Sequence, residues 1–265
     1  MKRNWDYILI HAREIIVSYD TRVTLRQLFY RLVAAEILPN TRSAYTQLSK
    51  NTAEARRAGN FPDLMDRTRN IYERTTFESP EEARQYIAEV YRRDRTEGQE
   101  YSVYLGVEKE GMVEQLSSWF GKFGLPIISL KGYASQSYVD IVTSHAIRRN
   151  RPAILIYAGD FDPSGIDIDR DFRERTRCFD AVHRIALNEE QITEHNLPPL
   201  MGKASDSRAA AFIERYGQLI QVELDALPPD ILRDLYTEAI DRYFDLSTWE
   251  QVLDIEKQER QELAE

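Results

Sequence analysis

Three carboxylates that follow two predicted strands are the residues of this chain best suited to chemistry. Glu108 follows the segment YSVYLGV, and Asp160 and Asp162 lie in AGDFDPSG, directly after AILIY. Pro163 and Gly165 favour a turn that lets Asp160 and Asp162 converge on one ion. The carboxyl ends of parallel strands meet at one edge of a sheet, so all three acids can lie together. Oxygen ligands without His or Cys predict a Mg²⁺ or Mn²⁺ site, and clustered carboxylates repel each other without a cation.

Other interpretations of this acidic segment remain open. A solvent-exposed loop is one alternative, and a glycosyltransferase D-x-D pair is another. An EF-hand would use Asp160, Asp162 and Asp171 as ligands, but a strand instead of a helix precedes this loop. Asp167, in the same segment, is a further candidate acid.

The second candidate for chemistry is a tyrosine beside an arginine in TLRQLFYRL, residues 24–32. The leucines recur at helical spacing, and Arg26 lies one turn before Tyr30 on the same side of the predicted helix. A tyrosine hydroxyl has a pKa near ~10 and is a weak nucleophile at neutral pH. An adjacent guanidinium favours the phenolate and stabilises a charged phosphate. Tyr30 is therefore either a core residue or a nucleophile held next to a cation.

Composition predicts a globular protein of the cytoplasm. The 265 residues are 42% hydrophobic and 30% charged, and the single cysteine, Cys178, excludes an internal disulfide. No apolar stretch approaches the ~20 residues of a membrane helix, and we expect no signal peptide and no membrane partner. The net charge of −9 is uneven: residues 1–75 carry 13 Lys or Arg against 8 Asp or Glu, whereas residues 101–265 carry 18 against 29. The N-terminal part is therefore mildly basic and the C-terminal part acidic.

The first hundred residues have the pattern of helices. Amphipathic helices are predicted over residues 4–18, 24–36 and 42–59, with Thr24 as N-cap and a short wing at 60–70. A helix, a tight break and a basic helix form a helix-turn-helix pattern, which also fits a plain helical bundle with a solvated basic face. The candidates for binding DNA phosphates are Arg42, Lys50, Arg56 and Arg57.

From residue 101 the pattern changes to alternating strands and helices, which predicts an α/β fold with a mostly parallel sheet covered by helices. A charged helix over residues 78–99 is expected to link the two parts. The predicted organisation is a helical domain 1–77, a helical linker 78–99, and an α/β domain 100–265 with C-terminal helices. Strands are predicted at 101–107, 125–130, 153–158, 182–187 and 220–227, and helices at 111–121, 135–149, 165–176, 206–216, 229–243 and 247–263.

Taken together, these segments resemble a Toprim domain, the metal-binding fold of topoisomerases, bacterial primases and several nucleases. AGDFDPSGIDI resembles the D-x-D-P-x-G form of the topoisomerase VI A subunit and the related meiotic double-strand-break transesterase. LKGYASQSY is similar to the K-G-Y segment of this family, and its Lys131 is a further nucleic-acid-binding candidate. RIALNEEQI and VELDALPP resemble later strands of the family. The resemblance covers roughly residues 20–245.

The resemblance implies a winged-helix domain before the Toprim domain and a nucleophile in an R-x-x-[YF]-Y segment, which Arg26, Phe29 and Tyr30 match. The implied reaction is attack of Tyr30 on a DNA phosphodiester to give a 5′-phosphotyrosyl link, with Mg²⁺ or Mn²⁺ held by the three acids. In the family, the tyrosine of one protomer works opposite the metal of its twin. The implied partners are therefore double-stranded DNA and a second copy of the chain.

The main expectation is a compact enzyme of this type that breaks DNA by tyrosine transesterification. Family A subunits carry an N-terminal extension that helps to dock an ATPase subunit, and little precedes Tyr30 here, so a separate ATPase partner stays an open expectation. Other winged-helix and Toprim proteins, such as the nuclease subunit of Wadjet plasmid-defence systems, hydrolyse DNA at the metal site, which would leave Tyr30 non-catalytic. A non-catalytic DNA-binding subunit is the third alternative, and RNA as the substrate is also left open.

Overall fold

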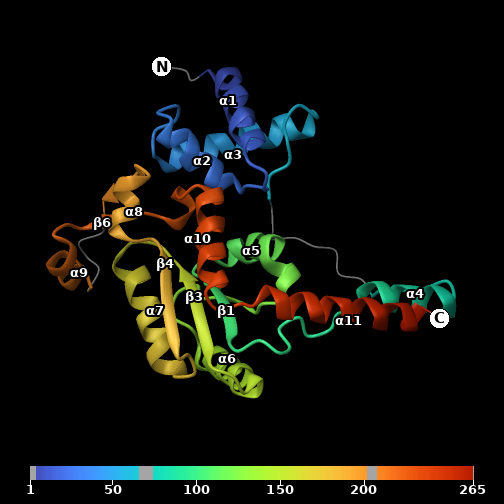
Figure 1. The fold of residues 1–265 in the computed structure, drawn as a ribbon. Coiled ribbons are helices and arrows are strands. Elements are labelled where there is room, and N and C mark those ends of the chain that lie inside the picture. The colour runs from blue at the N-terminus through green and yellow to red at the C-terminus, as the bar shows by residue number, and fades with distance from the viewer. Residues whose placement is uncertain (1–3, 66–73, 202–207, 265) are drawn as a thin grey trace.

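A four-stranded parallel sheet forms the centre of the molecule (Figure 1). The computed structural model describes residues 4–65, 74–201 and 208–264. The strands lie in the order β2-β1-β3-β4, so β1 and β3 are neighbours, and Val107 at the end of β1 pairs with Ala158 at the end of β3. The predicted α/β fold is confirmed, and these four strands were predicted to within two residues. They are β1 (Ser102–Val107), β2 (Ile127–Ser129), β3 (Ala153–Ala158) and β4 (Ala181–Ala186).

The side chains of the two central strands alternate between two hydrophobic cores. Leu105 of β1 and Ile156 of β3 lie in one core, whereas their neighbours Tyr104 and Leu155 lie in the other. This alternation arises because successive residues of a strand point to opposite faces of the sheet. Burial on both faces explains why these two segments consist almost entirely of apolar and aromatic residues.

Helices cover both faces of this sheet (Figure 1). The first core includes Leu116 of α5 and Tyr236 of α10, and the second includes Val142 of α6 and Phe172 of α7. The Tyr236 hydroxyl donates a hydrogen bond to the carbonyl oxygen of Gly106 (2.6 Å), which fixes α10 against the middle of β1. The bounds are α5 (Val113–Phe120), flanked by the 3₁₀ turns η1 (Glu110–Met112) and η2 (Gly121–Phe123), α6 (Gln136–Arg149), α7 (Pro163–Thr176) and α10 (Pro229–Asp241).

Three helices form the N-terminal part, and their leucines Leu28, Leu32 and Leu48 belong to the same core as the first face of the sheet. Thr24 begins α2 with a capping box, in which the side chains of Thr24 and Gln27 each accept the other's backbone N–H. The three predicted helices are confirmed, whereas residues 66–70 of the expected wing lie outside the described residues. The helices are α1 (Trp5–Ser18), α2 (Leu25–Ala34) and α3 (Arg42–Arg57).

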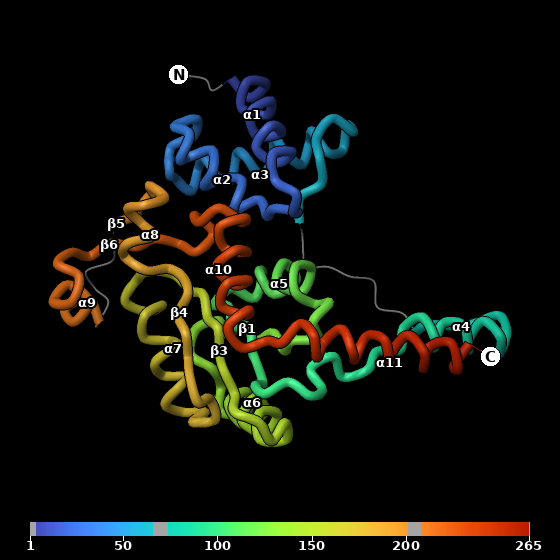
Figure 2. The backbone as a smooth tube through the Cα atoms, in the orientation of Figure 1, coloured from blue at the N-terminus to red at the C-terminus, as the bar shows by residue number. Residues whose placement is uncertain are grey.

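The prediction of one helix over residues 78–99 is only partly correct. The helix α4 (Pro80–Val90) ends early, because the chain beyond it is held in an irregular path by Glu256 of α11 (Leu246–Ala264). Glu256 is buried, accepts the backbone N–H of Arg93 (3.0 Å) and pairs with the Arg95 guanidinium (2.7 Å). As a result, α4 and α11 pack side by side in an arm that projects from the sheet (Figures 1 and 2).

The prediction of a strand over residues 220–227 is wrong for most of its length. Strand pairing covers only β6 (Ile220–Gln221) and a bridge between Val222 and Phe161, after which the chain forms the turn η3 (Leu224–Ala226). Pairing stops here because the backbone N–H of Leu224 donates to the Asp160 carboxylate (2.7 Å) instead of to another strand. The remaining elements are α8 (Glu189–Glu194), β5 (Leu200–Met201) and α9 (Ala209–Tyr216).

Across the described residues, every helix is either too short or too polar to span a bilayer.

Replacing Leu105 by alanine is expected to lower the free energy of unfolding by about 2–5 kcal/mol, because the change opens a cavity beside a fully buried position. Leu246, which is 48% exposed, is the matched control, and its alanine variant is expected to stay within about 0.5 kcal/mol of the native protein. Urea unfolding followed by circular dichroism measures both variants. Equal losses in the two would contradict the placement of β1 in the core.

Candidate functional site

Glu108 and Asp160 meet at the carboxyl edge of the sheet. Glu108 directly follows β1, and Asp160 lies two residues after β3. The backbone N–H of Asp160 donates to Glu108 Oε2 (2.8 Å), and the backbone N–H of Glu108 donates to the carbonyl oxygen of Ala158 (3.0 Å). The expectation that these two strand ends come together is therefore confirmed.

Burial and mutual repulsion make this pair of carboxylates reluctant to carry two negative charges. Burial raises the pKa of Glu108 to about 7, and the negative charges of Asp160 and Asp162 add to the rise. Burial also raises the pKa of Asp160, although the Lys109 ammonium opposes this effect. A cation bound between them would relieve the repulsion.

Asp162 holds the loop that carries the acids. It is the N-cap of α7, where Oδ1 accepts the backbone N–H of Gly165 (2.6 Å), while Oδ2 accepts the side-chain amide of Gln221 (3.2 Å). Both contacts come from neutral donors, and within the described ranges the Asp162 carboxylate makes no ion pair. Each oxygen also keeps a second lone pair for another ligand.

The donor chemistry of this edge fits a hard divalent cation such as Mg²⁺ or Mn²⁺, because Glu108, Asp160 and Asp162 offer only carboxylate oxygens. The close approach of Glu108 and Asp160 is the observation that supports this fit: burial raises the pKa of Glu108, and the negative charges of Asp160 and Asp162 add to the rise. Within the described ranges, no three Asp, Glu, His or Cys side chains already converge as a metal-binding group. Glu108 and Asp160, which already lie close together, are therefore the residues best placed to hold a metal ion.

Lys109 connects this acidic edge to two carboxylates that the sequence analysis missed. Its ammonium lies 2.7 Å from Asp225 Oδ2, 2.9 Å from Glu223 Oε2 and 3.1 Å from Asp160 Oδ1. Burial works against the charged form, but the three carboxylates raise the pKa of Lys109 above its ordinary value. The available signal was the E-x-D spacing in VELDALPP, the segment expected to be a strand.

Arg26 and Tyr30 of α2 lie beside the same carboxylates. The Arg26 guanidinium pairs with Glu223 and lies 3.9 Å from Asp225 Oδ2. Tyr30 is only 3% exposed. Burial raises the pKa of Tyr30 to about 12, and the charge of Glu223 adds to the rise, whereas Arg26 and Lys109 oppose it. The predicted pairing of Arg26 with Tyr30 is thus present, but the hydroxyl is buried and protonated at neutral pH.

A cleft of about 930 Å³ separates the N-terminal helices from the acidic edge. Glu108 lines it from the sheet, Arg26 from α2, Arg56 from α3 and Lys131 from the segment after β2. The Nε of Arg56 is buried and has no hydrogen-bond partner among the residues that the structure describes. Lys109, Glu110 and Asp225 also line the cleft, so it brings acidic and basic side chains from separate segments to a common space.

The other three basic residues predicted on α3, Arg42, Lys50 and Arg57, are exposed. They lie outside the lining of the cleft, and Lys50 has a loose pair with Glu54 at 3.9 Å. Helical spacing places Arg42 roughly 40° from the direction of the cleft-lining positions on α3, whereas Lys50 and Arg57 lie roughly 100–120° away from it. The four candidates on α3 therefore divide between the cleft and the exposed surface of the helix.

Arg184 of β4 is a positioning residue that the sequence analysis also missed. Its guanidinium donates to the carbonyl oxygens of Asp160 (2.6 Å), Gly159 (3.1 Å) and Gly165 (3.1 Å). It also lies 3.3 Å from Asp169 Oδ1. Arg184 thereby fixes the backbone on both sides of Asp160 and Asp162. In the sequence, its place in the segment RIAL was the only feature that pointed to it.

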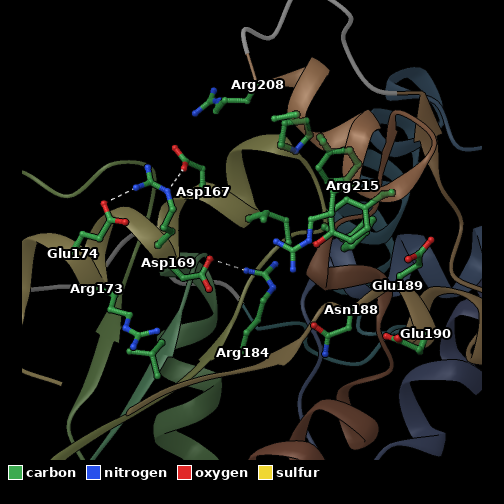
Figure 3. Close-up of a pocket in the computed structure, with 18 residues that line it drawn as sticks. Asp167, Asp169, Arg173, Glu174, Arg184, Asn188, Glu189, Glu190, Arg208 and Arg215 are labelled. Carbon is green, nitrogen blue, oxygen red and sulfur yellow. Dashed lines mark hydrogen bonds and ion pairs between the residues drawn. The ribbon is translucent and has the colours of Figure 1, made fainter. Parts of the chain in front are cut away.

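Asp167, the further candidate acid, faces a second cavity of about 820 Å³ between α7 and α9. It pairs with Arg170 (2.7 Å) and accepts the hydroxyl of Tyr133 (2.6 Å), and these two contacts lower the pKa of Asp167. Figure 3 shows Asp167 above the pair of Asp169 and Arg184. Asp167 is therefore separated from Glu108 and Asp160.

A search of protein-family models finds none that matches the chain, and no curated protein matches it. The likeness to the Toprim and topoisomerase VI A families therefore rests on the quoted motifs.

Replacing Gly165 by alanine is expected to displace the loop of Asp160 and Asp162. A Cβ at this position would overlap the carbonyl oxygen of Asp160 and lie 3.2 Å from Glu108 Oε2. We expect a loss of about 1–3 kcal/mol in the free energy of unfolding. Gly121→Ala, whose Cβ would meet only Ser117 Oγ at 3.5 Å, is the matched control and should be near neutral. Thermal unfolding of both tests this, and equal stability would contradict the tight approach.

The metal-free protein is expected to lose stability as the pH rises from about 4.5 to about 7. In this range the folded state retains the Glu108 proton, which the unfolded state releases, so the rise in pH favours unfolding. Urea unfolding in EDTA between pH 4 and pH 8 measures the slope. Glu108→Gln should flatten it, whereas Glu250→Gln on the exposed face of α11 should not. A slope unchanged in Glu108→Gln would contradict the raised pKa.

Proposed function

We propose that this chain cleaves DNA phosphodiester bonds with a divalent cation in the cleft between α2, α3 and the acidic edge of the sheet. One observation carries the proposal: a single cleft joins Glu108 to Arg26, Arg56 and Lys131. Phosphoryl transfer needs carboxylates that hold a cation and basic groups that hold phosphate oxygens. Glu108 faces the same space as the basic groups, and Asp160, outside the lining, contacts Glu108 through its backbone N–H.

The proposed architecture is a winged-helix domain over residues 1–77, a linker 78–99 and a Toprim domain 100–265. Three N-terminal helices and a parallel sheet with acids at neighbouring strand ends support this proposal. The relationship proposed is to the topoisomerase VI A subunit and the meiotic transesterase.

Each side chain has a proposed part in the reaction. Glu108 and Asp160 hold Mg²⁺ or Mn²⁺, with Asp162 as the third ligand, and the bound ion supplies charge stabilisation at the scissile phosphate. Arg56 offers its guanidinium to a phosphate oxygen, and Lys131 binds the backbone at the other wall of the cleft. Arg42, Lys50 and Arg57 extend this contact along α3.

Water is the nucleophile that this conformation favours. Tyr30 is 3% exposed, does not line the cleft, and has a pKa of about 12. Attack by water requires no movement of α2, whereas attack by Tyr30 requires its hydroxyl to become exposed.

Tyrosine transesterification is the second candidate, favoured by the placement of Arg26 beside Tyr30 at the edge of the acidic cluster. Arg26 opposes the rise in the Tyr30 pKa and so favours the phenolate. Two predictions belong to this candidate: a homodimer on double-stranded DNA, and a separate ATPase subunit.

Cleavage of supercoiled plasmid in Mg²⁺ or Mn²⁺ tests the proposal. Asp160→Asn is expected to slow cleavage by about 100-fold or more, the size of effect expected when a charge-stabilising group is lost. Asp254→Asn, on the exposed face of α11, is the matched control and should cleave normally. A native protein that binds DNA without cutting it would instead identify a non-catalytic DNA-binding subunit.

The products separate the two nucleophiles. Hydrolysis leaves free 5′-phosphate ends and persists in Tyr30→Phe. Transesterification leaves protein bound to 5′ ends after denaturation, and this adduct is lost in Tyr30→Phe but kept in Tyr7→Phe, whose side chain is exposed on α1.

A further inference from the structure

Lys109 places a permanent positive charge inside the acidic cluster, next to the residues proposed to hold the metal. We infer that its ammonium takes the place of a second divalent cation among Asp160, Glu223 and Asp225. The site would therefore bind only one exchangeable metal ion. This inference rests on the proposed metal site at Glu108 and Asp160.

The surroundings of the Lys109 ammonium have the composition of a metal site. Three carboxylate oxygens, one from each of three residues, lie 2.7, 2.9 and 3.1 Å from the nitrogen. The three N–H donors of the ammonium match these three acceptors. Three carboxylates are also the ligand set that hard divalent cations prefer. A simple ion pair would need one of these carboxylates, so the convergence of three calls for another explanation.

Charge balance points to the same assignment. Lys109 and Arg26 together offset most of the charge of Asp160, Glu223 and Asp225. Glu108 and Asp162 make no ion pair within the described ranges, where Glu108 accepts the backbone N–H of Asp160 and Asp162 accepts only neutral donors. An exchangeable cation is therefore needed on the side of Glu108, whereas the opposite side of Asp160 already has one that cannot dissociate.

The geometry also explains how the chain places its own cation, the Lys109 ammonium, next to the proposed metal position. Asp160 lies between the two positions: its backbone N–H contacts Glu108, and its Oδ1 accepts Lys109 and the backbone N–H of Leu224. Lys109 follows Glu108 in the sequence, and strand β1 therefore delivers both the proposed ligand and the tethered cation to the two sides of Asp160. The arrangement resembles a two-cation site with one position filled by the chain itself.

Counting Mn²⁺ bound per full-length chain by titration calorimetry at pH 7.5 tests the inference. The native protein is expected to bind one ion and Lys109→Met two, because removal of the ammonium leaves three carboxylates without a cation. In the double variant Lys109→Met with Asp225→Asn, affinity for the second ion should fall about tenfold or more, which corresponds to about 1.4 kcal/mol. Lys257→Met on the exposed face of α11 is the matched control and should bind one ion.

The outcomes separate this inference from the proposed function. One ion in both the native protein and Lys109→Met overturns the inference and leaves the metal site intact. Two ions in the native protein also overturn it. No ion in the native protein but one in Lys109→Met supports the Lys109 assignment and contradicts the proposed function, and no ion in either protein overturns both.

Folding of the variant supplies a second readout. The carboxylates left unpaired in Lys109→Met are expected to lower its melting temperature in EDTA. Mn²⁺ should then raise the melting temperature of Lys109→Met by more than it raises that of the native protein. A variant that stays destabilised in Mn²⁺ would show that Lys109 acts only as a structural tie, and would overturn the inference.

Discussion

The crowding of carboxylates at one edge of the sheet is the constraint on which the rest of the structure depends. The strand order places the ends of β1 and β3 side by side, so Glu108 and Asp160 must be neighbours. The chain returns after β6 with Glu223 and Asp225 to the same edge. Removing several like charges from water costs more than any one ion pair recovers. The surrounding structure is therefore arranged to supply positive charge and N–H donors to this edge.

The position of the N-terminal helices follows in part from this need. Arg26 lies on α2, and its pairing with Glu223 joins the helical part to the acidic edge of the same chain. The apolar face of α2 packs through Leu28 and Leu32 into the core that is shared with the sheet. Hydrophobic burial fixes the position of α2, and the ion pair between Arg26 and Glu223 holds the Arg26 side chain toward the cleft. The cleft with its mixed acidic and basic lining is the product of both interactions.

Sequence patterns predicted those features that depend on neighbouring residues. Strands β1 and β3 are buried at every position and are largely apolar, and Thr24 with Gln27 gives a local capping signal for α2. The helix at 78–99 was overestimated, because the contacts of Arg93 and Arg95 with Glu256 override helix propensity beyond Val90.

The parts of the site that were missed depend on contacts between distant segments. Lys109 meets Asp225 across 116 positions of sequence, and no local spacing encodes that pairing. Asp167 was added because it follows the D-x-D pair closely. Five residues of helix after the N-cap Asp162 rotate it by roughly 140°, away from the acidic edge.

Tyr30 and Arg26 are coupled through Glu223, and under the proposed function this coupling would link DNA binding to the choice of nucleophile. Glu223 raises the pKa of Tyr30 while Arg26 lowers it, and Arg26 is held by Glu223. A phosphate entering the cleft competes with Glu223 for the guanidinium, because Arg26 lines the cleft. If the phosphate displaces Glu223, the Arg26 guanidinium pairs with the substrate instead. The ion pair that joins α2 to the acidic edge is then lost. Exposure of Tyr30 would then accompany substrate binding, whereas an Arg26 that stays on Glu223 keeps Tyr30 buried and leaves the cleft to water.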